Sequence, residues 1–373
     1  MKKFLYAFVL ITTLAHGSST SPVPIDNLKV PPGFKISVFA RIPYARQINV
    51  AKDGMIYVGS SHHQGDNSVY AIKASDDYSH AEIIYQLATN LGSPIGVAYY
   101  NNDLYIGERY RISKIPNITG HWSNPAPVEV VLDNIPAEQN GHNWKYLKFG
   151  PDQRLYFQVG DPVDTSQSDD PIIHSILSIK PDGSDLQVYA HGLRNSVGFD
   201  WQPKNNALWF TDNGQDHLGD TFPPDEINRA PVKGMDFGFP CYAGNNVPVS
   251  NYTNCPPVDT VTPPIVELDA HAAPLGLMFY RGNQFPSEYK DNVIVAEHGS
   301  SIRSDKLVGY EVIRVIVQDD KVIKVEPLVS GWAVDGTFWG RPVDVAELYD
   351  GSLLISDDYS GTIYRLIYSP ILK

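Results

Sequence analysis

The stretch VGFDWQPKNNALWFTDNG, residues 197–214, contains two short apolar runs separated by a Pro- and Asn-rich turn. Val, Phe and Trp favour strands, whereas Pro, Asn and Gly favour turns, so the stretch predicts two antiparallel strands joined by a loop. Three polar or flexible residues, Asp212, Asn213 and Gly214, end it. A loop of this kind on a rigid scaffold is typical of a binding site.

The same hairpin pattern occurs six times along the chain. The other copies are QINVAKDGMIYVGS from Gln47, GVAYYNNDLYIGE from Gly96, KYLKFGPDQRLYFQVGD from Lys145, LGLMFYRGNQFPSEYKDNVIVAEHG from Leu275 and PVDVAELYDGSLLISDD from Pro342. A third apolar run follows five of the six, at Ser68, Arg111, Ser175, Tyr310 and Thr362. A repeat of roughly 40–50 residues with three or four strands in each unit is typical of a β-propeller.

We therefore expect an all-β, six-bladed β-propeller that forms a single domain over residues 18–373. A β-sandwich would not repeat one hairpin six times. The segment FKISVFARI from Phe34 has no hairpin of its own. We expect it to add an outer strand to the last blade, which would close the ring and hide both sheet edges. A Cys-containing loop insertion is expected near residues 235–265.

The first residues resemble an export signal rather than a structural element. A basic start, Met1 to Lys3, precedes an apolar run from Phe4 to Ala15, and residues 1–17 end in a small-residue cleavage site. The run is too short to span a bilayer, and no other stretch is long and apolar enough to do so. A buried core helix is the alternative for this segment. We expect an exported chain, periplasmic or secreted.

The net charge and the two cysteines bear on the type of partner and on the compartment of the protein. The formal net charge is −13 and no basic run occurs, which argues against a nucleic-acid partner. Cys241 and Cys255 are the only cysteines. In an oxidising compartment such a pair is most simply a disulfide that closes its loop.

Polar residues stand at equivalent places in the six copies, so the propeller would gather them at one end of its central channel. Before the first strands stand Arg46, His142, Arg194 with Asn195, His271 and Arg341; after the second strands stand Asp161, Asp212 to Gly214, Glu297 with His298, and Asp357 with Asp358. A basic, His-containing pocket in an acidic protein predicts an anionic ligand.

Several of these motifs are specific: GHNWKYLKFGPDQRLYFQVGD from Gly141, VYAHGLRNSVGFDWQP from Val188, TDNGQDHLGDTFPPDEIN from Thr211 and FWGRPVDVAELYDGSLLISDD from Phe338. The sequence resembles the soluble quinoprotein glucose/sorbosone dehydrogenases, most closely the sorbosone-dehydrogenase-like branch, over nearly the whole mature chain. The resemblance implies a six-bladed propeller that binds pyrroloquinoline quinone (PQQ) with Ca²⁺. It also implies a sugar substrate and an external electron acceptor, a quinone or a cytochrome.

The resemblance implies roles for individual residues. His142 would be the general base, because imidazole titrates near neutral pH, and Asp161 would orient it or the substrate. Arg194 and Asn195 of the GLRN motif would contact the quinone, and Arg194 would stabilise the charge on it. Further candidates for the cofactor are Arg46, His271, His298, Arg303 and Arg341. Main-chain carbonyls of Gly214 and Gln215 would bind calcium, although turn chemistry explains the same loop.

The chain departs from one glucose-dehydrogenase branch at three places. Val343 stands where that branch has a second Arg, no Lys occurs near Glu297 to Gly299, and Trp144 to Tyr146 replace the Gly-Arg after the catalytic His. Two alternatives therefore stay open: a calcium-dependent lactonase-type propeller hydrolase, and a catalytically inactive extracellular binding propeller.

Overall fold

The computed structural model describes residues 22–61, 67–138, 141–249, 252–300 and 302–370. The expected signal segment, residues 1–17, lies outside them. Among the described residues no helix is long and apolar enough to cross a membrane. The helical elements are single 3₁₀ turns: η1 (Ile25–Asn27), η2 (Val258–Thr260) and η3 (Ser287–Tyr289).

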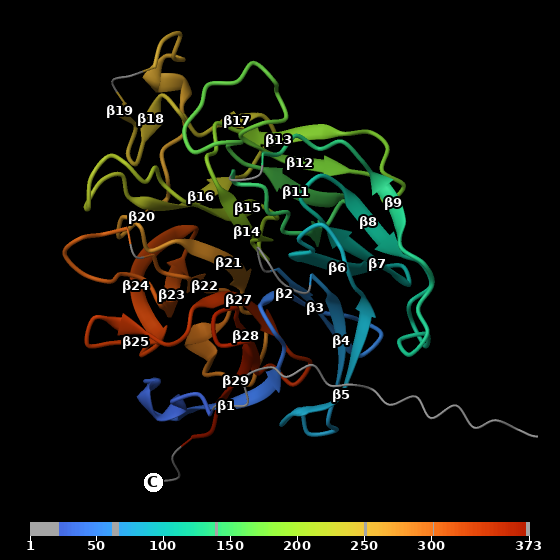
Figure 1. Ribbon diagram of the computed structural model, residues 1–373. Helices are drawn as coiled ribbons and strands as arrows, with labels where there is room; N and C mark the ends of the chain where they lie inside the picture. The colour runs from blue at the N-terminus through green and yellow to red at the C-terminus, as the bar shows by residue number, and fades with distance from the viewer. Residues whose placement is uncertain (1–21, 62–66, 139–140, 250–251, 301, 371–373) are drawn as a thin grey trace, which may run out of the picture.

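Six antiparallel sheets stand around a common axis, which confirms the predicted six-bladed propeller (Figure 1). From the axis outward, blade 1 has β2 (Ala45–Val50), β3 (Met55–Ser60), β4 (Val69–Ala74) and β5 (Ala81–Ala88). Blade 2 has β6 (Gly96–Tyr100), β7 (Asp103–Gly107), β8 (Ile112–Ile115) and β9 (Glu129–Leu132). Blade 3 has β10 (Lys148–Phe149), β11 (Leu155–Val159), β12 (Ser175–Ile179) and β13 (Gln187–His191).

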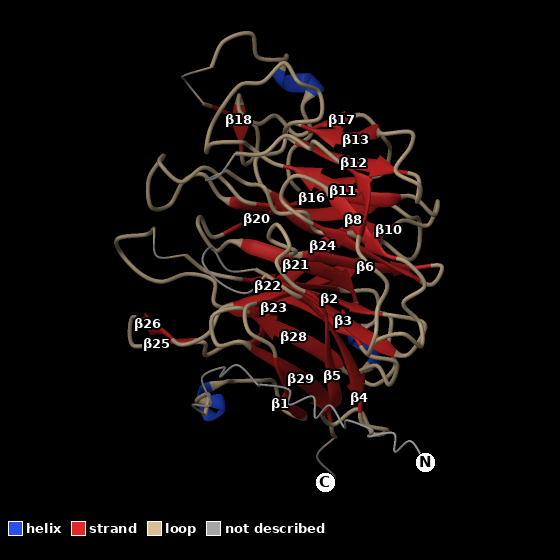
Figure 2. Ribbon diagram, turned by 45° about the vertical axis from the view of Figure 1, so that its right-hand side comes forward, coloured by secondary structure: helices blue, strands red, loops and turns tan. Residues whose placement is uncertain are grey.

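Blade 4 has β14 (Ser196–Trp201), β15 (Leu208–Asp212), β16 (Asp225–Ala230) and β20 (Val266–Leu268). Blade 5 has β21 (Pro274–Phe279), β22 (Val293–Glu297), β23 (Glu311–Gln318) and β24 (Lys321–Val329). Blade 6 has β27 (Pro342–Glu347), β28 (Leu353–Asp357), β29 (Thr362–Tyr368) and, outermost, β1 (Phe34–Arg41). Figure 2 shows the same sheets as red layers with loops between them.

The N-terminal strand closes the ring as predicted. β1 pairs with β29 in antiparallel register, from Phe34 opposite Tyr368 to Arg41 opposite Thr362. Phe34 also packs on rings from blades 5 and 6, with centroids 4.8 Å from Phe285 and 5.1 Å from Tyr368. The closing strand is therefore held by side-chain packing as well as by its backbone ladder.

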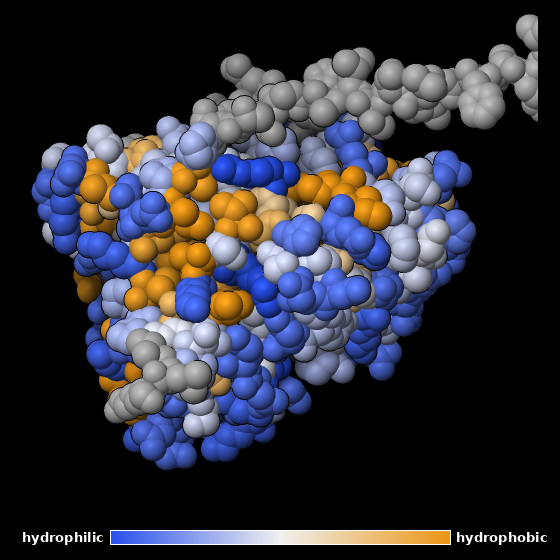
Figure 3. Space-filling model, turned by 90° about the horizontal axis from the view of Figure 1, so that it is seen from below, coloured by the Kyte–Doolittle hydropathy of each residue, from blue (hydrophilic) through white to orange (hydrophobic). Residues whose placement is uncertain are grey.

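Apolar clusters fill the spaces between neighbouring blades. One cluster joins Tyr57 of blade 1 to Leu104 of blade 2, and another joins Trp209 of blade 4 to Phe279 of blade 5. Each fully buried Leu or Phe contributes roughly 1.5–3 kcal/mol through removal from water. The core is thus spread around the ring, and it holds the inner strands in place. From below, the surface is mainly hydrophilic, with a band of apolar side chains across part of it (Figure 3).

The inner strand of blade 3 is shorter than the sequence predicts. We expected a strand from Lys145, but regular pairing is confined to Lys148–Phe149. Side-chain amides replace the ladder before it: Gln158 accepts from the Tyr146 N–H at 3.1 Å, and Gln47 accepts from the Leu147 N–H at 2.9 Å. Because these side-chain amides accept from the main-chain N–H groups, residues 145–147 do not need the strand pairing that begins at Lys148.

The insertion from blade 4 extends over blade 3. Its strand β17 (Met235–Asp236) lies parallel to β13 and becomes a fifth strand of blade 3. A small hairpin follows, β18 (Tyr242–Ala243) with β19 (Val247–Pro248), and a second small hairpin, β25 (Ala333–Val334) with β26 (Thr337–Phe338), precedes blade 6. The predicted disulfide is present, with Cys241 and Cys255 sulfurs 2.02 Å apart.

Candidate functional site

The first strand of each blade starts, and the second ends, at the same end of the channel. We call this end the mouth and define it by Arg46, His142, Arg194, His271 and Arg341. Antiparallel pairing fixes the arrangement, because Ser196 at the start of β14 lies opposite Asp212 at the end of β15. The hairpin therefore delivers its polar residues to one place.

Main-chain hydrogen bonds join blades 3 and 4 at the mouth. The His142 N–H donates to the Asp161 carbonyl at 2.8 Å, and the Asp161 N–H donates to the Arg194 carbonyl at 2.8 Å. Gly160 lies between the two, since a Cβ there would come within 2.8 Å of both the His142 Cβ and the Arg194 carbonyl oxygen. His142 and Arg194 thus lie side by side on the same face of the ring.

Acidic residues at the ends of second strands hold the arginines. Asp212 accepts from the N–H groups of Arg194 and Asn195, at 3.1 and 2.7 Å. Asp357 accepts from the Arg341 N–H at 2.9 Å in blade 6. Burial raises the pKa of both carboxyl groups to about 6, and the N–H donors oppose that rise. In blades 4 and 6, therefore, a buried carboxylate at the end of the second strand holds the backbone of the arginine just before the first strand.

The Arg194 guanidinium lies among oxygen atoms of two loops. It donates to the carbonyls of Gly214, at 2.6 Å, and Asp164, at 3.0 Å. It pairs with the Asp164 carboxylate and lies 3.3 Å from the Asp216 carboxylate. These contacts fix the guanidinium between the loops that follow β11 and β15, beside the carbonyl of Gly214.

The His142 ring is largely neutral near physiological pH. Burial, and then the nearby charge of Arg194, lower the pKa of His142 to about 4. Its Nδ1 is buried and has no hydrogen-bond partner among the described residues. An unprotonated imidazole beside a cation is suited to accept a proton from a bound hydroxyl group.

A second group at the mouth surrounds Arg46 of blade 1. The Arg46 guanidinium lies 3.5 Å from the centre of the Trp144 ring and 2.5 Å from the Asp358 carboxylate. The other oxygen of Asp358 bonds to His298 Nε2 at 2.9 Å, and Arg341 donates to the His298 carbonyl at 3.3 Å. The structure thus brings Arg46, His298 and Arg341 together.

The electrostatics of this group keep its histidine neutral and its carboxylate charged. Burial, together with the charges of Arg341 and Arg46, lowers the pKa of His298 to about 4, although the Asp358 carboxylate opposes this shift. Burial opposes ionisation of Asp358, but the His298 ring and Arg46 hold its pKa well below its usual range. The guanidinium groups of Arg46 and Arg341 therefore carry two positive charges against the one negative charge of Asp358, so the group has a net positive charge that an anionic ligand could balance.

The Asp225 carboxylate holds the loop that follows β15. This carboxylate accepts from the Gly214 N–H and the Ala273 N–H, each at 2.7 Å. Burial raises the pKa of Asp225 to about 7. His271 ties the far side of the loop through Nε2, 2.9 Å from the Gly219 carbonyl oxygen. Gly214 and Gln215, the predicted calcium ligands, thus occupy a braced turn.

Three predicted residues have surroundings that the sequence did not indicate. The Asp161 carboxylate is fully buried and forms hydrogen bonds with Ser166 and with His174 Nε2, both at 2.8 Å. The hydrogen bond of Asp161 to His142 is therefore made by its main-chain carbonyl and not by its side chain. Arg303 forms a double hydrogen bond with Asp305, at 2.7 and 2.6 Å, on the loop before β23. Asn195 is fixed through its main chain to Asp212.

The mouth fits an anionic, oxygen-rich group. Buried polar nitrogens without a partner among the described residues include Nε and Nη2 of Arg46, Nδ1 of His142 and Nε2 of Gln215. An unpaired buried donor costs roughly 1–3 kcal/mol, which a bound acceptor would recover. For a hard cation the turn offers the carbonyl oxygen of Gly214, which also accepts a hydrogen bond from Arg194. No cluster of three His, Cys, Asp or Glu suited to a metal occurs in the described part of the chain.

Sequence reasoning did not assign roles to Trp144, Asp358 or Asp164. Trp144 appeared only as a departure from a motif, and Asp358 only as a polar residue after a strand. An aromatic residue two positions after the His of a Gly-His turn is a signal that its ring could stack on a cation at the mouth. Asp164 carried no signal, because its pairing with Arg194 depends on how the loop after β11 folds back.

Comparison with known proteins gives one family and several relatives. The family model of the glucose/sorbosone dehydrogenases matches residues 72–365. A protein from Borreliella burgdorferi, described as uncharacterized, is 35% identical over 98% of each chain.

Solved structures share the fold. The holo form of the pyranose dehydrogenase PQQ domain from Coprinopsis cinerea superposes with a TM-score of 0.77 at 15% identity, over 94% of this chain and 99% of that one. The PQQ-bound aldose sugar dehydrogenase from Streptomyces coelicolor superposes with a TM-score of 0.63 at 18% identity, over 91% and 99%. At these identities the superpositions establish the architecture.

Proposed function

Because the chain belongs to the glucose/sorbosone dehydrogenase family, we propose that it is a PQQ- and Ca²⁺-dependent dehydrogenase of a sugar or related polyol. The observation that carries the proposal is that Nε and Nη2 of Arg46 have no partner among the described residues, where Arg46 meets Trp144 of blade 3 at the mouth. Bound PQQ would supply the two-electron acceptor that oxidation of a hydroxyl group to a carbonyl requires. Relatives named for PQQ binding support the same cofactor.

The arginines would hold the cofactor. PQQ carries carboxylates, and guanidinium groups bind carboxylates through paired, charge-assisted hydrogen bonds. Arg46 has two nitrogens for such bonds, and Arg341 lies in the same group around His298. Arg194 would contact the quinone from blade 4, with Asn195 beside it. Placing fixed positive charge where negative charge develops lowers the barrier of the chemical step.

His142 would act as the general base. Its ring is neutral above its pKa of about 4, so it can accept a proton throughout the physiological range. Because Nδ1 is buried, we assign Nε2 as the nitrogen that takes the hydroxyl proton. Main-chain bonding to Asp161 fixes the backbone of His142, and Asp161 is a positioning residue in this scheme.

The turn at Gly214 and Gln215 would hold Ca²⁺. Calcium prefers oxygen ligands, and the bonds from Asp225 and His271 keep this turn in place. Arg194 donates to the same Gly214 carbonyl, so Ca²⁺ and the Arg194 guanidinium would contact adjacent parts of the bound cofactor. We further propose that the protein works in the periplasm or outside the cell. The disulfide and the expected signal segment support that location, and a quinone or cytochrome would accept the electrons there.

Reconstitution tests the proposal. Purified apoprotein with added PQQ and Ca²⁺ should bind PQQ in calorimetry and reduce an artificial dye in the presence of an aldose. A panel of aldoses, polyols and lactones separates the dehydrogenase from a hydrolase, since lactone opening needs no PQQ. Absence of PQQ binding, together with absence of dye reduction for every sugar, would rule out the proposed activity.

A further inference from the structure

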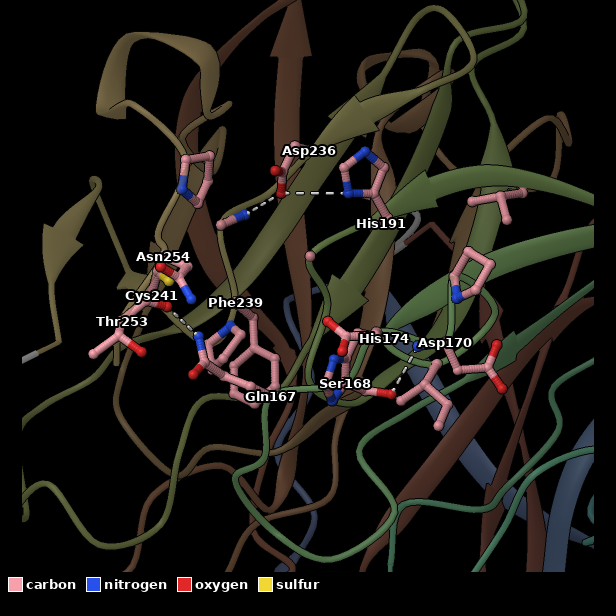
Figure 4. Close-up of a pocket in the computed structure, with 18 residues that line it drawn as sticks. Gln167, Ser168, Asp170, His174, His191, Asp236, Phe239, Cys241, Thr253 and Asn254 are labelled. Carbon is pink, nitrogen blue, oxygen red and sulfur yellow. Dashed lines mark hydrogen bonds and ion pairs between the residues drawn. The ribbon is translucent and has the colours of Figure 1, made fainter. Parts of the chain in front are cut away.

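A cavity of about 680 Å³ lies between blade 3 and the disulfide insertion (Figure 4). We call it the side cavity. Its walls come from the loop between β11 and β12, from the end of β13 with Gly192, and from the insertion between Asp236 and Pro256. None of the residues that define the mouth lines it. Its volume falls in the range of about 300–1,000 Å³ that small-molecule sites occupy, so it is large enough for a ligand of its own.

The walls of the side cavity are joined to one another. Gln167 Nε2 donates to the Thr253 carbonyl at 2.8 Å, which connects the loop of blade 3 to the insertion. The disulfide between Cys241 and Cys255 closes the insertion next to that contact. The cavity is therefore a braced feature of the structure rather than a gap between loose loops.

The side chains that line the side cavity carry negative charge. Three carboxylates line it, those of Asp169, Asp170 and Asp236, and no Lys or Arg of the described residues does. The N–H groups of Ile172 and Gly238 donate to Oδ1 of Asp170 and of Asp236, at 3.1 and 2.9 Å. One oxygen of each of these two carboxylates therefore has no donor in the described part of the chain. A cationic ligand could supply such donors.

The His174 ring adds a further acceptor to the walls. His174 is 6% exposed, and its Nε2 bonds to the Asp161 carboxylate at 2.8 Å. Burial opposes ionisation of Asp161, but hydrogen bonds from His174, Val163 and Ser166 lower its pKa to about 2. The ionised carboxylate can only accept, so Nε2 carries the proton and Nδ1 of the neutral ring has a free lone pair. Nδ1 has no partner among the described residues, and a buried nitrogen of this kind at a cavity wall indicates a missing donor.

Apolar surface lies between these acceptors. Figure 4 shows Asp236 with His191 on one side of the opening and His174 with Asp170 on the other. Apolar side chains complete the walls: Pro171, Ile173, Val188, Phe239, Pro240 and Pro256. The Phe239 ring lies edge-on to the His174 ring, with centroids 4.9 Å apart. Such walls suit the carbon chain of a ligand, and the face of an aromatic ring attracts a cation.

An organic cation fits these walls better than an anion or a metal ion does. A phosphate or an acidic ligand would be repelled by the three carboxylates. No group of three His, Cys, Asp or Glu that could hold a metal occurs in the ranges of the chain that the structure describes. An organic cation instead offers N–H donors to the acceptors and carbon atoms to the apolar surface.

We infer that the side cavity binds a small organic cation that has an ammonium or guanidinium group at each end of a short aliphatic chain. One end would donate to Asp236, and the other to Asp170 and His174. The inference involves neither PQQ nor a sugar, so it assigns the protein a ligand beyond those of the proposed function and does not depend on that function.

Calorimetric titration of the full chain with agmatine tests the inference. Agmatine has a guanidinium group at one end of a four-carbon chain and an ammonium group at the other. The titration is made in about 0.15 M salt, which screens non-specific attraction to the acidic protein. Butylamine is the control with one charged end, and butanediol is the uncharged control.

Variants locate the bound cation. Asp170→Asn and Asp236→Asn each remove one charge from the side cavity, and Thr253→Trp fills it from its exposed rim. Asp76→Asn is the matched control for charge, because Asp76 is exposed on the turn after β4 and does not line the cavity. Thr260→Trp is the matched control for bulk, since Thr260 is exposed on the insertion but does not line the cavity. Circular dichroism checks that each variant is folded.

Agmatine should bind at one site and more tightly than butylamine, and butanediol should not bind. Asp170→Asn and Asp236→Asn should each weaken agmatine binding ~10-fold, because each removes a charge-assisted hydrogen bond. Thr253→Trp should abolish binding, whereas the two control variants should change the affinity less than two-fold. Absence of agmatine binding, binding that survives Thr253→Trp, or equal weakening by Asp76→Asn overturns the inference.

Discussion

The guanidinium of Arg46 is held between the Trp144 ring, 3.5 Å away, and the Asp358 carboxylate, 2.5 Å away. This contact joins blade 1 to blades 3 and 6 at the mouth, and two nitrogens of the guanidinium have no partner among the described residues. The residue is a structural link, and in the proposed function it also donates to the cofactor.

Arg46→Lys should weaken PQQ binding. A lysine keeps the charge but loses the planar fork and the stacking surface, so we expect the affinity to fall ~10-fold or more. Calorimetric titration of PQQ into the apoprotein measures it. Arg365→Lys is the control, because Arg365 pairs with Asp350 at the far end of blade 6. Equal loss in both variants would show that the effect is not specific to the mouth.

His142→Ala should reduce kcat while the protein stays folded. General-base catalysis contributes ~10²–10⁴-fold, so a loss of at least ~10²-fold is expected in the reconstituted enzyme. PQQ affinity should change much less, since the anionic cofactor is bound mainly by arginines. His121→Ala, which replaces an exposed histidine of blade 2, should leave kcat unaltered. A kcat within two-fold of wild type would exclude His142 as the base.

The pH profile should report the lowered pKa of His142. The base form is lost as pH falls through the pKa of about 4, so kcat/KM should be level above roughly pH 5 and decline below it. Wild-type rates between pH 3.5 and 9, with folding checked by circular dichroism, give the profile. An inflection near the ordinary histidine pKa, about 6.5, would contradict the desolvated site.

Asp212→Asn should loosen the Arg194 backbone. The carboxylate accepts from Arg194, Asn195 and Ser196, and an amide would direct an N–H at one of these donors. We expect unfolding to become easier by ~1–3 kcal/mol and PQQ affinity to fall as well. Glu108→Gln is the matched control: Glu108 directly follows β7, the corresponding strand of blade 2, and accepts from the Gly92 N–H at 2.7 Å. It should lower stability without lowering PQQ affinity.

Phe34→Ala should destabilise the ring closure. Phe34 is 7% exposed and packs on three aromatic rings, so its truncation should cost ~3–5 kcal/mol. Urea unfolding followed by tryptophan fluorescence measures the change. Tyr349→Ala, at a residue 57% exposed, should stay within ~0.5 kcal/mol of wild type. Similar losses in both would mean that β1 contributes little beyond its backbone pairing.

Much of the fold could be predicted because its hairpins alternate strand formers with turn residues. The third strand of blade 4 was missed, since β16 has the sequence DEINRA and its burial depends on partners elsewhere. Asp225 in it is buried because it accepts from Gly214 and Ala273, which no local pattern reveals. The crossing of β17 onto blade 3 depends likewise on contacts made after folding.

The positions of candidate site residues could be predicted where the repeated hairpin determines them, but not where the path of a loop determines them. Arg46, His298 and Arg341 converge because first strands start, and second strands end, at the same end of the channel. The pairing of Asp164 with Arg194 depends on the path of the loop after β11, where no repeat applies.

The pairing of Phe34 with Tyr368 joins residues near opposite ends of the 373-residue chain. Blade 6 therefore cannot be completed until the final strand has been synthesised, however early the other blades form. A chain that stops before β29 leaves β1 without a partner strand and one edge of β28 unpaired, and such open edges favour aggregation and proteolysis. Closure of the ring therefore requires a chain that extends through β29.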